Sequence, residues 1–276
     1  MSVPAPTPIA LTIAGSDSSG GAGIQADLKT FTAFGVYGAS VLTALTAQNT
    51  HGVTGILAVP PEFVTQQIDA VAGDLRVSAV KTGMLNDCAT VLAVVEGLRR
   101  HGLAPIVVDP VMVATSGDML LQDDAVEAVR AELLPLADVI TPNLPEAARL
   151  LGLDAAQDVA GMRAQAQALL ALGPRAVLLK GGHGSGSEAV DIFVARGHDP
   201  VRLALPRVDT ANTHGTGCTL SAAIAAGLAK GESLIQAAEA AKRFVHAALL
   251  AGRHLKIGGG AGPVDHLHGM HNDRKA

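Results

Sequence analysis

The sequence predicts an α/β fold, with a mostly parallel β-sheet that is covered by helices on both faces. Three observations predict it. Short apolar runs alternate with longer segments of helical periodicity. Some of these runs are apolar throughout, as strands buried on both faces are. No linker rich in Pro and Ser and no fixed-period repeat divides the 276 residues, so we expect one domain over residues 1–276, with flexible tails at 1–8 and 266–276.

The first part of the chain supplies three predicted strands with two helices between them. In order they are the strand Ile9–Ala14, a helix over 24–34, a strand over 78–81, a helix over 87–100 and a strand over 105–109. The second helix is predicted because Val91, Val94 and Leu98 recur on one face. The third strand is a continuous apolar run, which is typical of a parallel sheet.

The remaining elements continue the alternation. They are a strand over 139–141, a helix over 159–172, the strand Ala176–Lys180, strands over 189–195 and 202–206, and helices over 217–228 and 233–250. Gly197 separates two apolar segments and predicts a hairpin. Asn143 can cap a helix that follows the strand over 139–141. Strand–helix alternation of this kind favours parallel pairing, with ligands bound beyond the carboxyl ends of the strands.

Composition excludes several classes of protein. The 20 Lys and Arg against 25 Asp and Glu give a net charge of −5, and only 2% of residues are aromatic, which argues against binding nucleic acid. Cys88 and Cys218 do not make a secreted disulfide framework at this length. The sequence shows neither a signal peptide nor a convincing membrane span. We therefore expect a soluble cytoplasmic protein.

A glycine motif near the N-terminus fits a dinucleotide-binding pattern only in part. Gly21, Gly23 and Ala26 satisfy G-x-G-x-x-A between a strand and a helix. Such a site needs an acidic residue about 20 positions later to hold the ribose, and the next acid after Asp27 is Glu62. We expect no nicotinamide site here, and no phosphate-loop motif is present elsewhere in the sequence.

The most informative motif is Asn-Thr-His-Gly-Thr-Gly-Cys-Thr at residues 212–219, which leads into an uncharged helix. Glycines allow the backbone to approach a ligand, and the start of a helix adds partial positive charge. Gly215, Thr216 and Gly217 are therefore candidates for holding an anion in transfer, most plausibly a phosphoryl group. A glycine-bent loop before a buried helix explains the same motif without a ligand.

Cys218 lies where this helix begins. A helix N-terminus can lower the pKa of a thiol below about 8.5, so that it accepts a proton from an attacking hydroxyl. Alternatively Cys218 only faces that hydroxyl, or is a small buried apolar residue. Cys88 has no glycine motif beside it and is interpreted as structural.

A second group of polar residues follows other predicted strands. Asn143 and Glu146 fall on one helical turn, Asp109 ends its strand, and Lys180 precedes two glycines. Mg²⁺ keeps several waters and few protein carboxylates, so Asp109 and Glu146 are candidate ligands, with Lys180 toward a nucleotide phosphate. A capping pair explains Asn143 and Glu146 equally well, and a lone lysine is often merely solvated. His266, His268 and His271 are expected on a surface tail.

Seven segments in this order resemble the hydroxymethylpyrimidine and phosphomethylpyrimidine kinases of thiamine synthesis, a branch of the ribokinase-like superfamily. The resemblance covers nearly the whole chain, and residues 262–264 and His266 fit the family's ending. The segments are AGSDSSGGAGIQADLKT at 14–30, AQNT at 47–50, KTGML at 81–85, VDPVM at 108–112, TPNLPEA at 141–147, KGGH at 180–183 and NTHGTGCT at 212–219.

The resemblance implies a three-layer α/β/α sandwich, a homodimer, and transfer of the ATP γ-phosphoryl group to 4-amino-5-hydroxymethyl-2-methylpyrimidine and then to its monophosphate. It implies Mg²⁺ as a cofactor and leaves open whether a monovalent cation such as K⁺ also binds. By position, the family's pyrimidine contacts fall on Gly15, Asp27, Gln48, Met84, Val111 and Cys218. The anion site falls on Gly215, Thr216 and Gly217, and the nucleotide and magnesium side on Asp109, Asn143, Glu146 and Lys180.

Other functions remain open at this point. Sugar kinases of the superfamily usually have Asp where this chain has Cys218, which leaves the base undecided. A pyridoxal or pyridoxine kinase has a similar acceptor, although the Gln48 amide suits an aminopyrimidine edge. A non-catalytic pyrimidine-binding regulator should have lost part of the set, and none of it is missing. A Cys-dependent acyl transferase needs a base such as His214 oriented toward the thiol.

Overall fold

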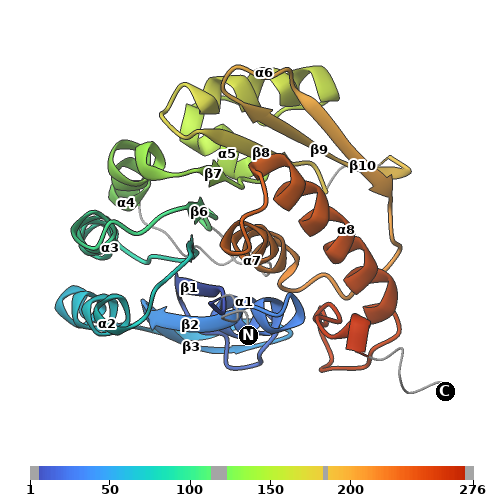
Figure 1. Ribbon diagram of the computed structural model, residues 1–276. Coiled ribbons are helices and arrows are strands. Elements are labelled where there is room, and N and C mark those ends of the chain that lie inside the picture. Colours follow the sequence, from blue (N-terminus) through green and yellow to red (C-terminus); the bar gives the residue numbers. More distant parts are fainter. Residues whose placement is uncertain (1–5, 113–122, 183–185, 271–276) are drawn as a thin grey trace, which may run out of the picture.

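The computed structural model describes residues 6–112, 123–182 and 186–270, and a central eight-stranded sheet organises them (Figure 1). The strand order is β10-β9-β8-β7-β6-β5-β1-β2, and a separate hairpin pairs β3 with β4. The strands are β1 (Ile9–Ala14), β2 (Tyr37–Leu42), β3 (Ala44–Asn49), β4 (Gly52–Ala58), β5 (Ala79–Thr82), β6 (Ile106–Val108), β7 (Val139–Ile140), β8 (Ala176–Lys180), β9 (Glu188–Ala195) and β10 (Val201–Pro206).

Pairing in the sheet is parallel from β2 to β8, and only β9 and β10 join it as an antiparallel hairpin. The predicted mostly parallel sheet is therefore confirmed. The carboxyl ends of β1, β5, β6, β7 and β8 meet at one edge, where a ligand is expected to bind.

Helices cover both faces and complete the predicted three-layer sandwich. The helices are α1 (Gly23–Ala33), α2 (Pro61–Asp74), α3 (Cys88–Arg100), α4 (Asp123–Ala128), α5 (Leu144–Leu151), α6 (Val159–Leu170), α7 (Thr216–Ala229) and α8 (Leu234–Gly252), with short turns η1 (Val129–Leu133), η2 (Leu134–Leu136) and η3 (His268–Met270). Helices α2 to α6 share one apolar cluster with the sheet, and α1, α7 and α8 share the other.

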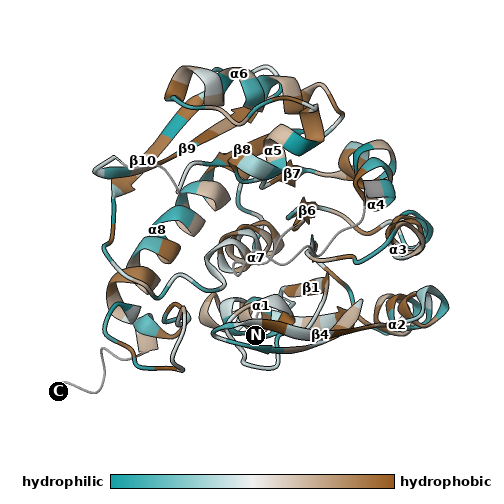
Figure 2. Ribbon diagram, turned by 180° about the vertical axis from the view of Figure 1, so that it is seen from behind, coloured by the Kyte–Doolittle hydropathy of each residue, from teal (hydrophilic) through white to brown (hydrophobic). Residues whose placement is uncertain are grey.

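Helix α7 lies inside its layer rather than on the surface. Its residues from Thr219 to Leu228 are all buried, and it contacts α1, α8 and the central strands β1, β5 and β6. A helix that is buried on every side has no solvent face, which explains why this segment carries no charge before Lys230. Figure 2 shows the contrast, with hydrophilic residues on outer helices such as α6.

The predicted elements are confirmed to within two residues at each end. Capping explains several helix starts: Asp87 accepts from Thr90 N, and Asn143 forms a capping box with Glu146. The prediction omitted β2, β3, β4, α2 and α4, together with the short turns η1, η2 and η3. Most positions of the β3–β4 hairpin are partly or fully exposed, so its sequence lacks the apolar run that marks the core strands.

The predicted tails need correction. Residues 1–5 and 271–276 lie outside the described residues, as do His183 and His271. Within the described part, His266 is only 4% exposed and is hydrogen-bonded through Nε2 to Thr219 Oγ1 at 3.0 Å. The ring of His268 packs against Phe244 with centroids 4.8 Å apart. Residues 266–270 are therefore part of the folded body, because the chain before them runs against α7 and α8.

Among the described residues, no helix has both the length and the apolar character needed to cross a membrane.

Candidate active site

The residues that follow the parallel strands do meet at one edge of the sheet, as predicted. Lys180 N donates to Pro142 O at 2.9 Å, and Lys180 forms a β-bridge with Asn143. Lys180 Nζ lies 2.9 Å from Asp109 Oδ1. The ends of β6, β7 and β8 thus place Asp109, Asn143 and Lys180 side by side.

Asp109 is buried, and its carboxylate is held by three neighbours, of which Lys180 is one. Its Oδ1 also accepts from Thr141 Oγ1 at 3.1 Å, and its Oδ2 accepts from Ser221 Oγ of α7 at 3.2 Å. Burial opposes ionisation, but the ammonium groups of Lys180 and Lys81 outweigh it and hold the pKa of Asp109 below its usual value. Asp109 is therefore a fixed negative charge beside α7.

Glu146 lies close to this pair and is also buried. Burial raises the pKa of Glu146 against the opposing charge of Lys180, and together with the charge of Asp109 it brings that pKa to about 7. Asn143 N donates to Glu146 Oε2 at 2.7 Å, and Glu146 N donates to Asn143 Oδ1 at 2.8 Å. The capping interpretation is confirmed, and it leaves Glu146 Oε1 outside the cap.

Two acidic side chains at this position suit a magnesium ion that keeps most of its waters. A bound cation would also favour the ionised form of Glu146, which burial disfavours. The described residues contain no cluster of three or more His, Cys, Asp or Glu that could enclose a metal ion. Asp109 and Glu146 therefore fit a hydrated ion shared with a ligand better than a closed protein site.

The glycine turn, defined here as residues 212–217, lies against the Asp109–Lys180 pair. A Cβ on Gly217 would be 3.3 Å from Lys180 Nζ and 3.9 Å from Asp109 Oδ2. Gly215 caps α7 with φ +79°, and a Cβ there would overlap the carbonyl oxygen of Gly21. Only glycine combines this positive φ with so close an approach.

Two backbone amides at the start of α7 are available for a ligand. Thr216 N donates to Thr213 O at 3.2 Å, and Thr219 N donates to Gly215 O at 2.9 Å. Between them, no described residue accepts a hydrogen bond from Gly217 N or Cys218 N. Free amides at a helix N-terminus, beside a lysine, make an anion site. Thr216 contributes differently, because its hydroxyl donates to Thr213 O at 2.6 Å and closes the turn.

Of the alternatives open for Cys218, the one in which the helix terminus lowers the pKa of the thiol is contradicted. Burial raises the pKa of the Cys218 thiol to about 11, and the nearby Lys81 ammonium only partly offsets burial and the charges of Asp27 and Asp109. Desolvation is the largest of these contributions. Cys218 is a neutral thiol near pH 7. Cys88, half-buried at the start of α3, packs against the core.

Asp27 and Lys81 form a second pair, and both side chains are 0% exposed. Asp27 Oδ2 accepts from Lys81 Nζ at 2.8 Å and from Thr12 Oγ1 at 2.6 Å, whereas no described group donates to Oδ1. Burial raises the pKa of Asp27 despite Lys81. Lys81 begins one of the segments that carry the family resemblance, but no role is predicted for it from the sequence, although a lysine inside an apolar strand is a signal.

The other predicted pyrimidine contacts lie nearby. A Cβ on Gly15 would be 3.2 Å from Met84 Sδ, so Gly15 and Met84 are neighbours. Val111 is half-buried just beyond Asp109. Gln48 is on β3, where its Oε1 accepts from Thr46 Oγ1 at 3.1 Å. These positions are compatible with the predicted roles, which remain predictions.

His214 pairs with a residue that the sequence motifs did not single out. Its Nε2 lies 2.8 Å from Asp17 Oδ2, and both side chains are buried. No described hydrogen bond joins His214 to Cys218, so the arrangement that an acyl transferase needs is absent from the described residues.

Comparison with known proteins identifies relatives that are kinases. The phosphomethylpyrimidine kinase family model matches residues 17–265. A hydroxymethylpyrimidine/phosphomethylpyrimidine kinase of Rhizobium meliloti is 60% identical over 262 residues, covering 95% of this chain and 98% of its own. A Bacillus subtilis pyridoxal kinase solved with ADP has a TM-score of 0.88 at 38% identity, covering 96% and 99% of the two chains. A Clostridium difficile phosphomethylpyrimidine kinase has a TM-score of 0.77 at 44% identity, covering 87% and 99%.

Proposed function

Because the chain belongs to the phosphomethylpyrimidine kinase family, we propose that it transfers the γ-phosphoryl group of ATP to the hydroxymethyl of 4-amino-5-hydroxymethyl-2-methylpyrimidine, and then phosphorylates the monophosphate to the diphosphate. A kinase role in thiamine synthesis follows from the family. The observation that carries the proposal is the start of α7, where Gly217 N and Cys218 N have no acceptor among the described residues and Gly217 lies beside Lys180.

Phosphoryl transfer depends mainly on positioning and on stabilising charge. The hydroxyl oxygen of the pyrimidine forms a bond to the γ-phosphorus, while the bond from that phosphorus to the β,γ-bridging oxygen breaks and ADP leaves. The amides of Gly217 and Cys218 and the Lys180 ammonium face the oxygens that carry charge in this step. Preorganised donors of this type contribute about 10²–10³-fold each.

The hydroxyl proton has no strong base in contact with it in this proposal. A thiol with a pKa of about 11 is almost entirely protonated at pH 7. In a loose transition state the attacking oxygen develops little charge, so its proton can leave late, to an oxygen of the transferred phosphoryl group. Cys218 therefore faces the acceptor as a thiol and contributes shape and a weak hydrogen bond.

Asp109 and Glu146 are the residues that would hold a magnesium ion through its waters. The ion, when bound, neutralises charge on the phosphate oxygens. Asn143 acts indirectly, because its amide oxygen fixes the turn that carries Glu146. We propose these roles, with or without an added monovalent cation, as part of the same kinase site.

A pyridoxal kinase activity is the second candidate, because solved neighbours at 34–38% identity are named pyridoxal kinases. Asp27 favours the aminopyrimidine, since its free Oδ1 in a dry site needs a donor and the exocyclic amine supplies one. A non-catalytic regulator is less supported, because the predicted acidic, lysine and glycine positions are all present.

We also propose that the protein is a cytoplasmic homodimer. Large apolar side chains are exposed on β2, on the β3–β4 hairpin and at the start of α2, which lie at one end of the molecule (Figure 1). They are Tyr37, Leu45, Ile56, Leu57 and Phe63. Because the family resemblance implies a homodimer, we expect a second copy of this chain to cover these side chains. Light scattering of the wild type and of Leu57→Asp tests this, and a wild-type monomer at micromolar concentration would refute it.

Mass spectrometry tests the kinase proposal. The protein is incubated with Mg²⁺, ATP and the hydroxymethylpyrimidine, and products are weighed over time. We expect one added phosphate first and two later, with kcat/KM for the pyrimidine at least about tenfold above that for pyridoxal. Absence of a phosphorylated pyrimidine would refute the proposed function.

A further inference from the structure

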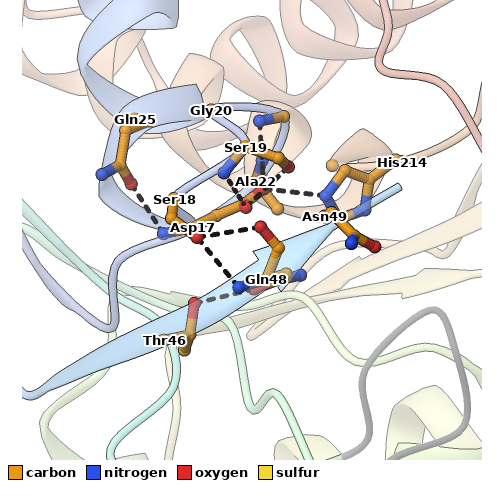
Figure 3. A network of polar contacts seen from close by, with 12 residues as sticks. Asp17, Ser18, Ser19, Gly20, Ala22, Gln25, Thr46, Gln48, Asn49 and His214 are labelled. Carbon is orange, nitrogen blue, oxygen red and sulfur yellow. Dashed lines mark hydrogen bonds and ion pairs between the residues drawn. The ribbon is translucent and has the colours of Figure 1, made fainter. Parts of the chain in front are cut away.

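The loop between β1 and α1 contains one carboxylate with an unusual number of donors. Asp17 Oδ1 accepts from Ser19 N at 2.8 Å and Ser19 Oγ at 2.7 Å. Asp17 Oδ2 accepts from Gly21 N at 3.0 Å, from Ala22 N at 2.8 Å and from His214 Nε2 at 2.8 Å. Figure 3 shows these contacts converging on Asp17. Asp17 therefore fixes its own loop and also reaches the glycine turn 197 positions away.

His214 is the residue before Gly215, so its side chain holds the start of the glycine turn. Its backbone N donates to Gly262 O at 3.0 Å, which anchors the main chain independently of the ring. The ring packs so closely on Gly21 that a Cβ there would overlap it. The β1–α1 loop and the glycine turn thus meet at two points, His214 on Asp17 and Gly215 on Gly21.

The same loop holds the β3–β4 hairpin on its other side. Ser18 Oγ accepts from Gln48 N and donates to Gln48 O, each at 2.8 Å. Ser16 Oγ accepts from Thr46 N at 3.2 Å, and Ser16 O accepts from Thr46 Oγ1 at 2.8 Å. Asp17 lies between Ser16 and Ser18. Alternate residues of one short segment therefore bind the strand that carries Gln48 and the turn that carries the free amides.

We propose that Asp17 and His214 are a positioning pair for phosphoryl transfer, which sets the distance between the acceptor bound near Gln48 and the phosphoryl group bound at the glycine turn. The inference rests on the proposed kinase function and deepens it. Neither side chain touches a reacting atom. Their effect operates through Gly215 to Gly217 on one side and Ser18 on the other.

The energetics support a rigid contact. A carboxylate that accepts several charge-assisted or backbone hydrogen bonds in a buried place is held firmly. Burial alone would raise the pKa of Asp17. The hydrogen bonds from His214, Ser19 and Ala22 outweigh burial and hold this pKa well below its usual value. A displacement of about 1 Å between reacting groups can lower a rate about 10²-fold. Loss of the contact should therefore reduce kcat more than binding.

Three substitutions of His214 separate this role from simple stabilisation. In His214→Gln, the amide nitrogen can reach the place of Nε2 and still donate to Asp17. In His214→Asn, the shorter side chain brings its amide only to the place of Nδ1, and His214→Leu has no donor at all. The matched control is His246, a partly exposed histidine of α8 whose Nε2 lies 3.0 Å from Pro206 O, replaced by the same three residues.

The readouts are kcat, both KM values, and the ratio of pyrimidine phosphorylated to ATP hydrolysed. The ratio does not depend on how much of the sample is folded. We expect His214→Asn and His214→Leu to lower kcat about 10–100-fold and to lower the ratio, with KM for ATP changed less than about threefold. His214→Gln should retain kcat and the ratio within about threefold of wild type, as should the His246 variants.

Three results would overturn the inference. In the first, kcat of His214→Gln falls as far as that of His214→Asn; in the second, the His214 variants lose kcat while the ratio is unchanged; in the third, His214→Asn and His214→Leu are as active as wild type. If His214→Leu does not fold, the comparison of Gln with Asn still decides, because both side chains are small polar amides. A wild type that makes no phosphorylated pyrimidine refutes the kinase function instead. An active wild type with unaffected Asn and Leu variants refutes only the positioning role.

Discussion

Two buried lysine–carboxylate pairs lie at the same edge of the sheet, and they differ in how far their hydrogen bonds are satisfied. In the Asp27–Lys81 pair both side chains are fully enclosed, and Asp27 Oδ1 has no described partner. In the Asp109–Lys180 pair both carboxylate oxygens have donors, and Lys180 remains 14% exposed beside the glycine turn. The first pair leaves one carboxylate oxygen without a donor among the described residues, whereas the second pair has donors on both oxygens and a partly exposed lysine.

The pKa directions agree with this difference. Burial raises the pKa of Asp27 in spite of Lys81, whereas two lysines hold the pKa of Asp109 below its usual value. A closed pair with an unpaired oxygen suits recognition of a neutral polar group, and an open ionised pair suits stabilisation of phosphate charge. Under the proposed function, the closed pair would serve substrate recognition and the open pair would serve transfer.

Lys81→Met gives the largest expected effect on stability, because it leaves the Asp27 carboxyl buried without its cation. We expect the free energy of unfolding to fall by about 3–5 kcal/mol. Urea denaturation measures this. The double variant Asp27→Leu/Lys81→Met should recover most of the loss, since no buried charge remains. A single variant as stable as wild type would contradict the closed-pair interpretation.

Lys180→Met affects the open pair, so its main effect should be on rate. We expect kcat to fall about 10²–10³-fold, because the lysine stabilises charge that develops in transfer. The unfolding free energy should fall less than in Lys81→Met, since Lys180 is not fully enclosed and Asp109 keeps Thr141 and Ser221. Steady-state kinetics with urea denaturation check both parts. Equal loss of stability in the two lysine variants would remove the contrast.

Glu146, beside the Asp109–Lys180 pair, should make the unfolding free energy depend on pH. Its pKa is raised from 4.5 to about 7 in the folded protein, so the unfolded chain loses this proton at lower pH. The unfolding free energy of the ligand-free protein should therefore fall as pH rises from about 4.5 to about 7, by up to ~3 kcal/mol.

Glu146→Gln should remove this slope, and Glu62→Gln, on an exposed residue at the start of α2, should keep it. Urea denaturation at pH 5 and pH 7.5 compares the three proteins. An identical slope in wild type and Glu146→Gln would show that Glu146 is not buried next to Asp109 as described.

Cys218→Ala gives the smallest expected effect. A neutral thiol that only faces the acceptor contributes contact area and a weak hydrogen bond, so kcat should fall less than about tenfold and ATP binding should be unchanged. A general base would contribute about 10²–10⁴-fold. A loss in that larger range, with a kinetic pKa that disappears in the variant, would contradict the neutral-thiol interpretation.

Most of the sheet was predictable because its strands are buried on both faces. The run over 105–109 and the strand Ala176–Lys180 are apolar almost throughout, and periodicity marks α3. The β3–β4 hairpin was not predictable, because it lies outside the main sheet and exposes residues such as Leu57, which is 67% exposed. The local pattern there reflects neither a core strand nor a helix.

Some residues of the candidate site could likewise be predicted from the sequence, and others could not. Residues directly after strands, such as Asp109 and Lys180, could be assigned because parallel strands end at one edge. The contact between Asp17 and His214 joins residues 197 positions apart, and no local pattern encodes it. The pKa of Cys218 could not be predicted, because the helix terminus is local while burial beside Asp27 and Asp109 depends on the whole fold.

The central claim is that Gly217 N and Cys218 N hold the phosphoryl group in transfer. A crystal structure of the protein with Mg²⁺, a non-hydrolysable ATP analogue and the hydroxymethylpyrimidine tests it most directly. We predict γ-phosphate oxygens within about 3 Å of both nitrogens, with the Lys180 ammonium in contact. A γ-phosphate bound elsewhere, with both amides still unpaired or turned away from it, would contradict the claim.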